Sequence, residues 1–253
     1  MTVLPHWTEA GTGPAIVLLH GISGGAEGWR PMFGALVAAG HRVVAWDLPG
    51  YGRSPALPES SFAAWVDALL RLADAAGLLR PILVGHSLGG MIALEAALTA
   101  PDRFERLVLA CMTPGFGGMN GAAQQAFLDT RLGPLNHGAT MAELASTVIP
   151  DMMALQAATD LKESHQALMA TIPPECYRAA MTALVNFDRR HALAQLDLPV
   201  TCIAGESDRI ARPAVMRAMA SRLPHGRYVV LPGAGHLAPF EQPAQFVAAL
   251  LAP

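Results

Sequence analysis

The feature that most constrains the fold is a regular alternation between short apolar runs and longer amphipathic segments. The apolar runs are bounded by Gly, Pro or charged residues: AIVLLH (15–20), RVVAW (42–46), PILVG (81–85), LVLAC (107–111), PVTCIAG (199–205) and RYVVLPG (227–233). Continuous runs of this kind are typical of strands buried on both faces of a parallel sheet. Helical patterns lie between or after them, at 62–77, 88–100, 213–223 and 243–252. The alternation predicts an α/β fold with a doubly wound, mostly parallel sheet.

The alternation is interrupted once, between the runs at 107–111 and 199–205. The intervening chain has no convincing strand and contains helical patterns such as 141–158 and 174–187. Because it is too long for a bare crossover, we predict a helical cap insertion over residues 117–190, with residues 1–116 and 191–253 forming the core. Half of the twelve methionines fall in the insertion. At helical spacing they either fill its interior or give a substrate pocket a flexible apolar lining.

Composition narrows the possible partners. The chain has 253 residues, 52% of them hydrophobic and only 15% charged, with a formal net charge of -3. There is therefore no broad basic field for nucleic acid or an anionic membrane, and we expect a small-molecule partner. The opening lacks the pattern of a signal peptide and no spanning apolar stretch follows, which predicts a soluble, cytoplasmic protein. Oligomeric state leaves no readable signal.

The cysteines are odd in number and show no metal-ligand or redox spacing. Cys111 and Cys202 lie in apolar runs, where a thiol behaves as a small hydrophobe, and Cys176 lies in the insertion. We interpret them as structural and expect no metal and no cofactor.

The pentapeptide around Ser87 carries the first chemical signal. Gly85-His86-Ser87-Leu88-Gly89 joins the apolar run PILV to a helical pattern, with a further glycine at position 90. A serine at such a junction occupies a strained turn and presents its hydroxyl at a helix N-terminus, where developing negative charge is favoured. Ser87 is thus the candidate nucleophile.

A serine nucleophile needs a base and an acid that orients the base, and two later loops provide them. His236 follows the run at 227–233, and Asp208 follows the run at 199–205. Both are predicted at the carboxyl edge of the sheet, together with Ser87. Glu206 is the alternative acid, but Asp208 is better placed on the turn, and the segment after LVLAC offers no carboxylate.

An oxyanion hole requires two backbone N–H groups aimed at the same point. Leu88, directly after the nucleophile, is one predicted donor. The loop that follows the run at 15–20 supplies the other, with Ile22 favoured and Ser23 the nearest alternative.

Other polar residues receive structural interpretations. His86 is expected to pack or hydrogen-bond locally within the turn, and Asp47 to stabilise the loop WDLPGYGRS. The remaining histidines that lack a glycine-rich loop after a strand are interpreted as structural or surface residues: His41, His137, His165, His191 and His225.

With these motifs in hand, the sequence resembles the α/β-hydrolase superfamily. The matching pieces are LLHGISGG, WDLPGYGRS, LVGHSLGGMIALEAA, PDRFERLVLACMTPG, IAGESDRIARP and PGAGHLAPFEQP. The resemblance implies the roles of nucleophile, acid and base for Ser87, Asp208 and His236, and oxyanion roles for Ile22 and Leu88. Within the superfamily, PDRFERLVLACMTPGFG and IPPECYRAAMTALVNFDRR look most like 3-oxoadipate enol-lactonases and related esterases.

The sequence therefore predicts a serine hydrolase of small carboxylic esters or lactones. HGISGGAEGW is also similar to a motif of meta-cleavage carbon-carbon hydrolases, although Ser23 and Gly25 depart from it. Carbon-carbon hydrolysis, cofactor-free perhydrolysis and a ligand-binding receptor on the same fold are the alternatives. If the substrate carries a carboxylate, a cation should receive it, and the candidates are Arg131, Arg178, Arg189 and Arg209.

Overall fold

The computed structural model describes residues 3–116 and 121–252, and within them a seven-stranded sheet forms the centre of the molecule. The strand order is β1-β3-β2-β4-β5-β6-β7, with β1 antiparallel to β3 and every other neighbouring pair parallel. The strands are β1 (Trp7–Ala10), β2 (Ala15–Leu19), β3 (Arg42–Trp46), β4 (Ile82–His86), β5 (Leu107–Ala110), β6 (Val200–Gly205) and β7 (Gly226–Leu231). The predicted mostly parallel sheet is confirmed.

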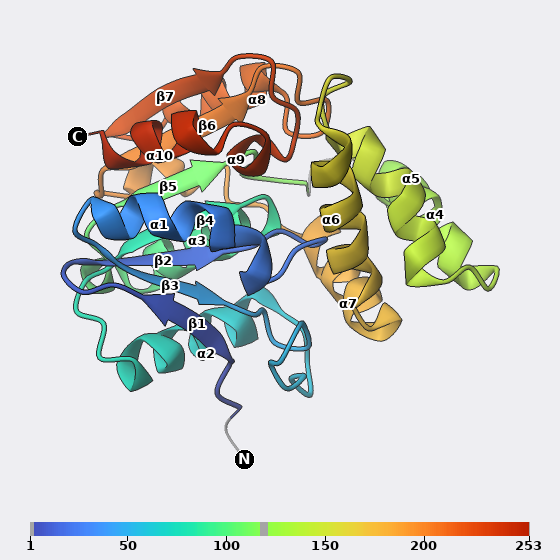
Figure 1. The fold of residues 1–253 in the computed structure, drawn as a ribbon, viewed down its shortest axis with the longest axis horizontal. Helices are drawn as coiled ribbons and strands as arrows, with labels where there is room; N and C mark the ends of the chain where they lie inside the picture. The colour runs from blue at the N-terminus through green and yellow to red at the C-terminus, as the bar shows by residue number, and fades with distance from the viewer. Residues whose placement is uncertain (1–2, 117–120, 253) are drawn as a thin grey trace.

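Helices lie on both faces of this sheet and beyond the carboxyl ends of its parallel strands (Figure 1). Those that pack on the sheet are α1 (Arg30–Ala38), α2 (Phe62–Ala75), α3 (Leu88–Thr99), α8 (Pro213–Ala220), α9 (Ala238–Glu241) and α10 (Pro243–Leu251). Those between β5 and β6 are α4 (Gly121–Asn136), α5 (Met141–Met152), α6 (Thr159–Ala170) and α7 (Pro174–Val185). Short 3-10 helices span Ala26–Trp29, Pro101–Arg103 and Leu193–Gln195.

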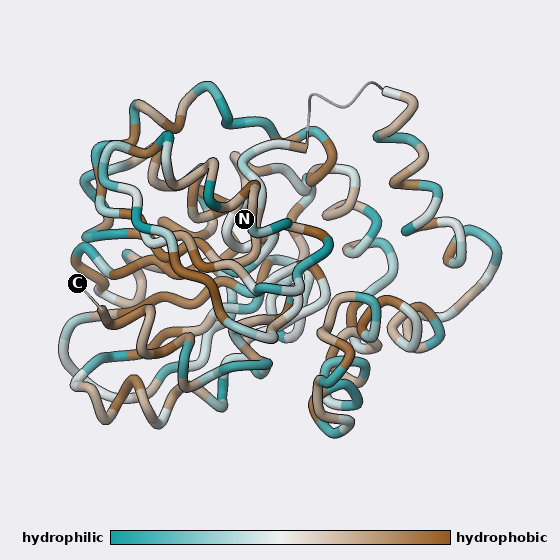
Figure 2. The backbone as a smooth tube through the Cα atoms, turned by 90° about the horizontal axis from the view of Figure 1, so that it is seen from above, coloured by the Kyte–Doolittle hydropathy of each residue, from teal (hydrophilic) through white to brown (hydrophobic). Residues whose placement is uncertain are grey.

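Alternate residues of the strands β2 to β6 enter two separate hydrophobic cores. In β2, Val17 and Leu19 face the core that contains α2, α3 and α8, whereas Ile16 and Leu18 face the core that contains α1 and α10. Side chains in a strand point alternately to opposite faces, so both sets must be apolar when helices cover both faces. This explains the unbroken apolar runs, which stand out as hydrophobic segments inside the molecule in Figure 2.

Two elements of the core have weak sequence signals. Strand β1 has the sequence WTEA and pairs with β3 alone, at the edge of the sheet. Its residues are half-buried or exposed, so the strand does not need a continuous apolar run. Helix α1 buries only Met32 and Leu36 and carries a proline in its first turn. Neither has the strong periodicity on which a prediction from sequence depends.

The four helices α4–α7 lie together beyond the carboxyl ends of the parallel strands (Figure 1). The segments that lead into and out of them pair with each other, because Gly115 and Asp188 form an antiparallel bridge and Phe116 N–H donates to the carbonyl of Phe187 at 2.7 Å. These pairings lie next to the predicted limits at 117 and 190, although residues 117–120 themselves lie outside the described residues.

The helix predicted over 141–158 is shorter in the structure and ends at Met152. Met153 is extended, three residues after Pro150. The backbone beyond Met152 instead makes a tertiary hydrogen bond to the end of α9, since Ala154 N–H donates to the Glu241 carboxylate at 2.9 Å. Periodicity alone does not reveal such a competitor for the backbone groups.

Candidate active site

Ser87 lies at the junction of β4 and α3 in a strained backbone conformation. Its φ is 52° and its ψ is -116°, in a region that residues with a side chain rarely adopt. Its N–H donates to the carbonyl of Ala110 on β5 at 2.9 Å, which anchors the turn to the sheet. The sharp turn brings the Ser87 hydroxyl to the N-terminus of α3, as its sequence pattern predicts.

The glycines beside Ser87 are dictated by close backbone contacts. A Cβ at Gly85 would lie 2.3 Å from the carbonyl oxygen of Gly89, and one at Gly89 would lie 2.3 Å from that of Leu19. Any side chain there would have to displace main-chain atoms. The turn can therefore form only where α3 approaches both β4 and β2 without side chains between them.

His236 joins Ser87 to Asp208 in one hydrogen-bonded chain. The Ser87 Oγ and His236 Nε2 are 3.0 Å apart, and the His236 Nδ1 and Asp208 Oδ2 are 2.8 Å apart. The consistent tautomer has Nδ1–H donating to the carboxylate and Nε2 accepting from the serine hydroxyl. The three residues are buried, with exposures of 8% for Ser87 and 3% for both His236 and Asp208.

The Asp208 carboxylate is held in its ionised form. Burial by itself would raise the pKa of Asp208, but His236 and the backbone N–H groups of Ile210 and Ala211 outweigh burial and lower it. Those two N–H groups donate to Asp208 Oδ1 at 2.8 and 3.0 Å. Glu206, the alternative acid, instead accepts from Gly233 N–H at 2.8 Å and makes no contact with the imidazole.

Two further histidines organise the loops around this chain. His86 Nε2–H donates to the backbone carbonyl of His236 at 2.7 Å, so its hydrogen bond is long-range rather than local to the turn. Burial, together with the nearby His236, lowers the pKa of His86 to about 3, which keeps it neutral. His20 bridges the carbonyl of Gly21, at 2.8 Å, and the N–H of Leu48, at 3.0 Å, and thereby fixes the loop after β2.

Ile22 and Leu88, the two predicted oxyanion donors, both lie beside Ser87. Leu88 is the first residue of α3, so its N–H has no acceptor within the helix. Ile22 lines the same pocket as Ser87, whereas Ser23 lines a separate cavity with His165 and Phe240. Asp47 anchors this loop, because its carboxylate accepts from Ala26 N–H at 2.9 Å and from Arg53 N–H at 3.1 Å.

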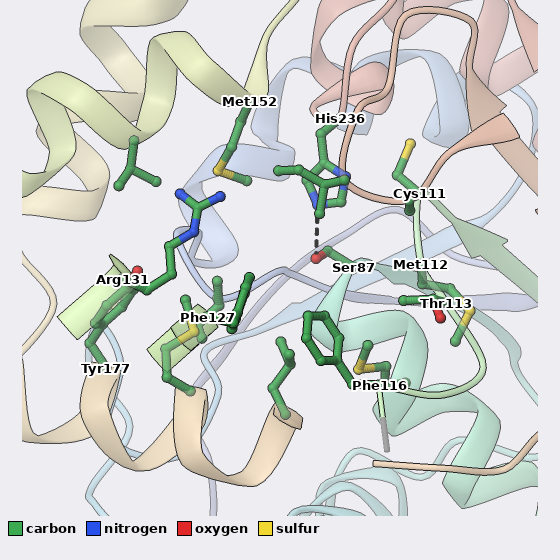
Figure 3. Close-up of a pocket in the computed structure, with 17 residues that line it drawn as sticks. Ser87, Cys111, Met112, Thr113, Phe116, Phe127, Arg131, Met152, Tyr177 and His236 are labelled. Carbon is green, nitrogen blue, oxygen red and sulfur yellow. Dashed lines mark hydrogen bonds between the residues drawn. The ribbon is translucent and has the colours of Figure 1, made fainter. Parts of the chain in front are cut away.

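A predominantly apolar pocket opens at Ser87 between the sheet edge and the helices α4–α7 (Figure 3). Met152 and Met181 of the insertion line it, while Met141, Met153 and Met169 are buried without lining it. Met119 lies outside the described residues. The lining residues are Ile22, Ser87, Met91, Cys111, Met112, Thr113, Phe116, Phe127, Arg131, Val148, Met152, Tyr177, Met181, Leu184, Ile210, Ala211 and His236.

The four candidate arginines differ in their hydrogen-bond partners and in their position relative to the pocket. Arg189 forms a two-pronged pair with Glu95, and Arg209 donates to the carbonyl of Asp151 at 3.0 Å. Arg178 donates to the side chain of Asn136. Of the four, only Arg131 lines the pocket that contains Ser87.

The loop that carries His236 is bound directly to the insertion, a contact that the sequence does not reveal. His236 N–H donates to the carbonyl of Met152 at 2.7 Å. The Glu241 carboxylate accepts from Gly235 N–H at 3.0 Å and from Ala154 N–H at 2.9 Å. Burial raises the pKa of Glu241, although these backbone donors oppose that shift. Glu241 lies close to His236 in the sequence, but no local pattern distinguishes it from other surface acids.

The cysteines are free, with Cys111 and Cys202 buried as expected. Burial raises the pKa of the Cys111 thiol well above its ordinary value and that of the Cys202 thiol to about 12, so both remain protonated. Over the described ranges 3–116 and 121–252, no three His, Cys, Asp or Glu side chains are grouped to hold a metal ion. No helix in that part of the chain is both long and apolar enough to span a bilayer.

The sequence also matches known proteins. Residues 14–243 match the family described as alpha/beta hydrolase fold. The pimeloyl-[acyl-carrier protein] methyl ester esterase of Aliivibrio salmonicida is 31% identical over 244 residues, which cover 95% of this chain and 91% of the relative. The RutD protein of Variovorax paradoxus, which is named for carbamate hydrolysis, is 31% identical over 245 residues, covering 94% of this chain and 91% of the relative.

Solved structures agree with these matches. An esterase from Thermogutta terrifontis superposes with a TM-score of 0.89 at 27% identity, covering 98% of this chain and 92% of that one. The enol-lactonase of Burkholderia xenovorans LB400 gives a TM-score of 0.83 at 23% identity, covering 98% and 96%, and so shows the same fold. The family match spans most of the sequence and the relatives align over nearly their whole lengths, so this chain belongs to the alpha/beta hydrolase family.

Proposed function

We propose that the protein hydrolyses a small carboxylic ester or lactone through an acyl-enzyme on Ser87. The observation that carries the proposal is the hydrogen-bonded chain from Ser87 through His236 to Asp208, which opens into an apolar pocket. Similarity to a methyl ester esterase over 95% of the chain supports an ester bond as the target. No metal or cofactor takes part in the proposed reaction.

Acylation begins when the Ser87 oxygen attacks the substrate carbonyl carbon. As the new C–O bond forms, the Ser87 proton passes to His236 Nε2, and the carbonyl oxygen becomes an oxyanion that the N–H groups of Ile22 and Leu88 stabilise. Asp208 stabilises the resulting imidazolium and fixes its orientation. The intermediate then collapses, and His236 gives its proton to the departing alkoxide.

Deacylation repeats the same steps with water in place of Ser87. His236 accepts a proton from the attacking water, the second oxyanion forms at the same two N–H groups, and the proton returns to the Ser87 oxygen as the acid departs. In a lactone the alkoxide and the acid belong to one molecule, and the product is a hydroxy acid.

The helices α4–α7 are proposed to act as a cap that sets substrate choice. They supply Phe127, Met152, Tyr177 and Met181 to the pocket, whereas the core supplies Ser87 and His236. Enclosing the ester between the two parts removes water from it and strengthens every electrostatic interaction with the developing charge.

The test is Ser87→Ala assayed with p-nitrophenyl acetate and with a neutral lactone. We expect kcat to fall by about 10⁴-fold or more. A fluorophosphonate probe should label the wild-type protein at Ser87 and leave Ser87→Ala unlabelled. Turnover that survives the substitution would refute the acyl-enzyme.

Carbamate hydrolysis is the second candidate, favoured by the similarity to the RutD protein at 31% identity. The same residues would attack a carbamate carbonyl, with an amine or ammonia as the leaving group. Comparing kcat/KM for an ester and a carbamate that share one acyl substituent decides between the two. A larger kcat/KM for the carbamate would replace the ester assignment.

A further inference from the structure

Two hydrogen-bond donors interrupt the apolar wall of the pocket on the side of the cap. Arg131 projects from α4 and Tyr177 from α7. The described lining residues include no Asp or Glu, and the hydroxyl of Thr113 already donates to the carbonyl of Gly115 at 2.9 Å. Apart from Ser87 and His236, Arg131 and Tyr177 therefore supply the polar chemistry that a ligand would meet.

The Arg131 guanidinium has no anionic partner in the part of the chain that the structure describes. Its carbon lies 5.7 Å from the centre of the Phe127 ring, a cation–π contact that orients the group without using its N–H donors. Figure 3 shows the guanidinium near Met152, among the residues that line the pocket. The other candidate arginines direct their donors to Glu95, Asn136 and the carbonyl of Asp151.

Tyr177 is fully buried, and its hydroxyl finds no hydrogen-bond partner among the described residues. Burial raises the pKa of Tyr177 to about 12, while the nearby Arg131 cation opposes that shift. The phenol is thus a neutral donor at physiological pH. Most buried polar groups have a hydrogen-bond partner, so an unpartnered phenol in the pocket wall leaves a donor that a ligand can use.

We infer that Arg131 and Tyr177 form a recognition site for a carboxylate group of the substrate. This carboxylate lies at a distance from the ester bond that is cleaved. This inference rests on the proposed ester hydrolysis at Ser87. A planar guanidinium can hold both oxygens of a carboxylate, and a phenol O–H can donate to one of them. The apolar surroundings strengthen these charge-assisted hydrogen bonds. A substrate with an apolar end leaves the Arg131 and Tyr177 donors without an acceptor, which is unfavourable in the same surroundings.

The preferred substrates are therefore esters or lactones with an anionic end. A matched carboxamide has the same shape without the charge, so it isolates the contribution of the anion. The carboxylate can belong to the acyl half, as in the monomethyl esters of succinic to suberic acid, or to the alcohol half, as in acetate esters of ω-hydroxy acids. Testing both series shows whether the site binds a carboxylate on the acyl half or on the alcohol half of the substrate.

The decisive quantity is the ratio of kcat/KM for each carboxylate ester to kcat/KM for its carboxamide. We expect the wild-type ratio to exceed ten for at least one chain length, and Arg131→Met to lower that ratio about 10-fold to 100-fold. Tyr177→Phe should lower it about tenfold. Arg178→Met, on the same helix as Tyr177 but outside the pocket, is the matched control and should leave the ratio unchanged.

A second measurement separates this inference from the proposed function. Calorimetry on Ser87→Ala measures binding of the same esters without turnover, and adding Arg131→Met should weaken carboxylate binding by the same factor. If binding discriminates but no ester is turned over, the carboxylate site stands and the ester hydrolase fails. A wild-type ratio near one in both series, or a ratio that neither Arg131→Met nor Tyr177→Phe changes, overturns the carboxylate site.

Discussion

At the scale of single residues, two carboxylates two positions apart have different surroundings. Asp208 contacts the imidazole of His236 and two backbone N–H groups, whereas Glu206 accepts from Gly233 at the protein surface. We therefore predict that Asp208→Asn lowers kcat by about 10³-fold to 10⁴-fold, because an amide favours the wrong imidazole tautomer. Glu206→Gln is the matched control and should change kcat less than about threefold. Steady-state kinetics on p-nitrophenyl acetate measures both, and an equal loss in the two variants would contradict the assignment.

His86 makes stability depend on pH. Its pKa is about 3 in the fold and near 6.5 when unfolded, so below pH 6.5 the unfolded state takes up a proton that the folded state does not. The free energy of unfolding should thus decrease as the pH falls, by about 1.4 kcal/mol per pH unit from this one group.

Urea unfolding between pH 7.5 and 5 tests this prediction. His86→Gln retains a donor for the His236 carbonyl but cannot titrate, so it should reduce the pH slope by close to one proton. His20 and His165, whose pKa values burial also lowers, still contribute to the slope in both proteins. An identical slope in wild type and variant would show that His86 titrates normally in the fold.

At the scale of secondary-structure elements, the position of α3 depends on glycines, because a residue with a Cβ would collide with main-chain atoms. A Cβ at Gly89 would lie 2.3 Å from the carbonyl oxygen of Leu19 and 2.6 Å from that of His20. Gly89→Ala should therefore destabilise the protein by about 3 kcal/mol or more, because main-chain atoms must move.

A second helical glycine provides the comparison. Gly34 in α1 has open space around the position of a Cβ and is not followed by proline, so Gly34→Ala should stabilise the protein by about 0.5 to 1 kcal/mol through helix propensity. Chemical denaturation of the two variants measures the difference. Equal effects would mean that propensity, and not the contact with β2, governs position 89.

At the scale of the whole molecule, Glu241 links the segment after α5 to the loop that holds His236. Its carboxylate accepts N–H bonds from Gly235 of that loop and from Ala154, between α5 and α6. Glu241→Gln replaces a charged acceptor by a weaker one and should reduce stability by about 1 to 3 kcal/mol. Hydrogen exchange should increase in residues 152–156 and 233–236 together. Glu27→Gln, which removes one side of an exposed pair with Arg30, should change stability by less than about 1 kcal/mol.

Simultaneous exchange of both segments is the signature of the coupling. If Glu241→Gln accelerates exchange only in the loop after β7, the cap is held by other contacts. The bond from His236 N–H to Met152 O would then be the main link between the two parts.

Most of the core and the candidate catalytic residues follow from local sequence. The strands from β2 to β6 are buried on both faces, so each leaves a continuous apolar run, and the turn around Ser87 requires glycines that the sequence displays. Because parallel strands end at one edge of the sheet, the residues after them must meet, and this brings Ser87, Asp208 and His236 together. Strand β1 and helix α1 cannot be predicted in this way, because β1 lies at a sheet edge and α1 buries only two side chains.

Only the tertiary structure decided what surrounds the serine. It ends α5 at Met152, whose carbonyl accepts from His236 N–H, and it turns His86 towards a carbonyl 150 residues away. It also places Arg131 in the pocket beside Tyr177, whereas three other arginines that are equivalent candidates in the sequence lie outside that pocket. The physical reason is that apolar periodicity and glycine sterics are local properties of the chain. The partner of a polar group, by contrast, depends on which distant segments the fold brings within hydrogen-bonding distance.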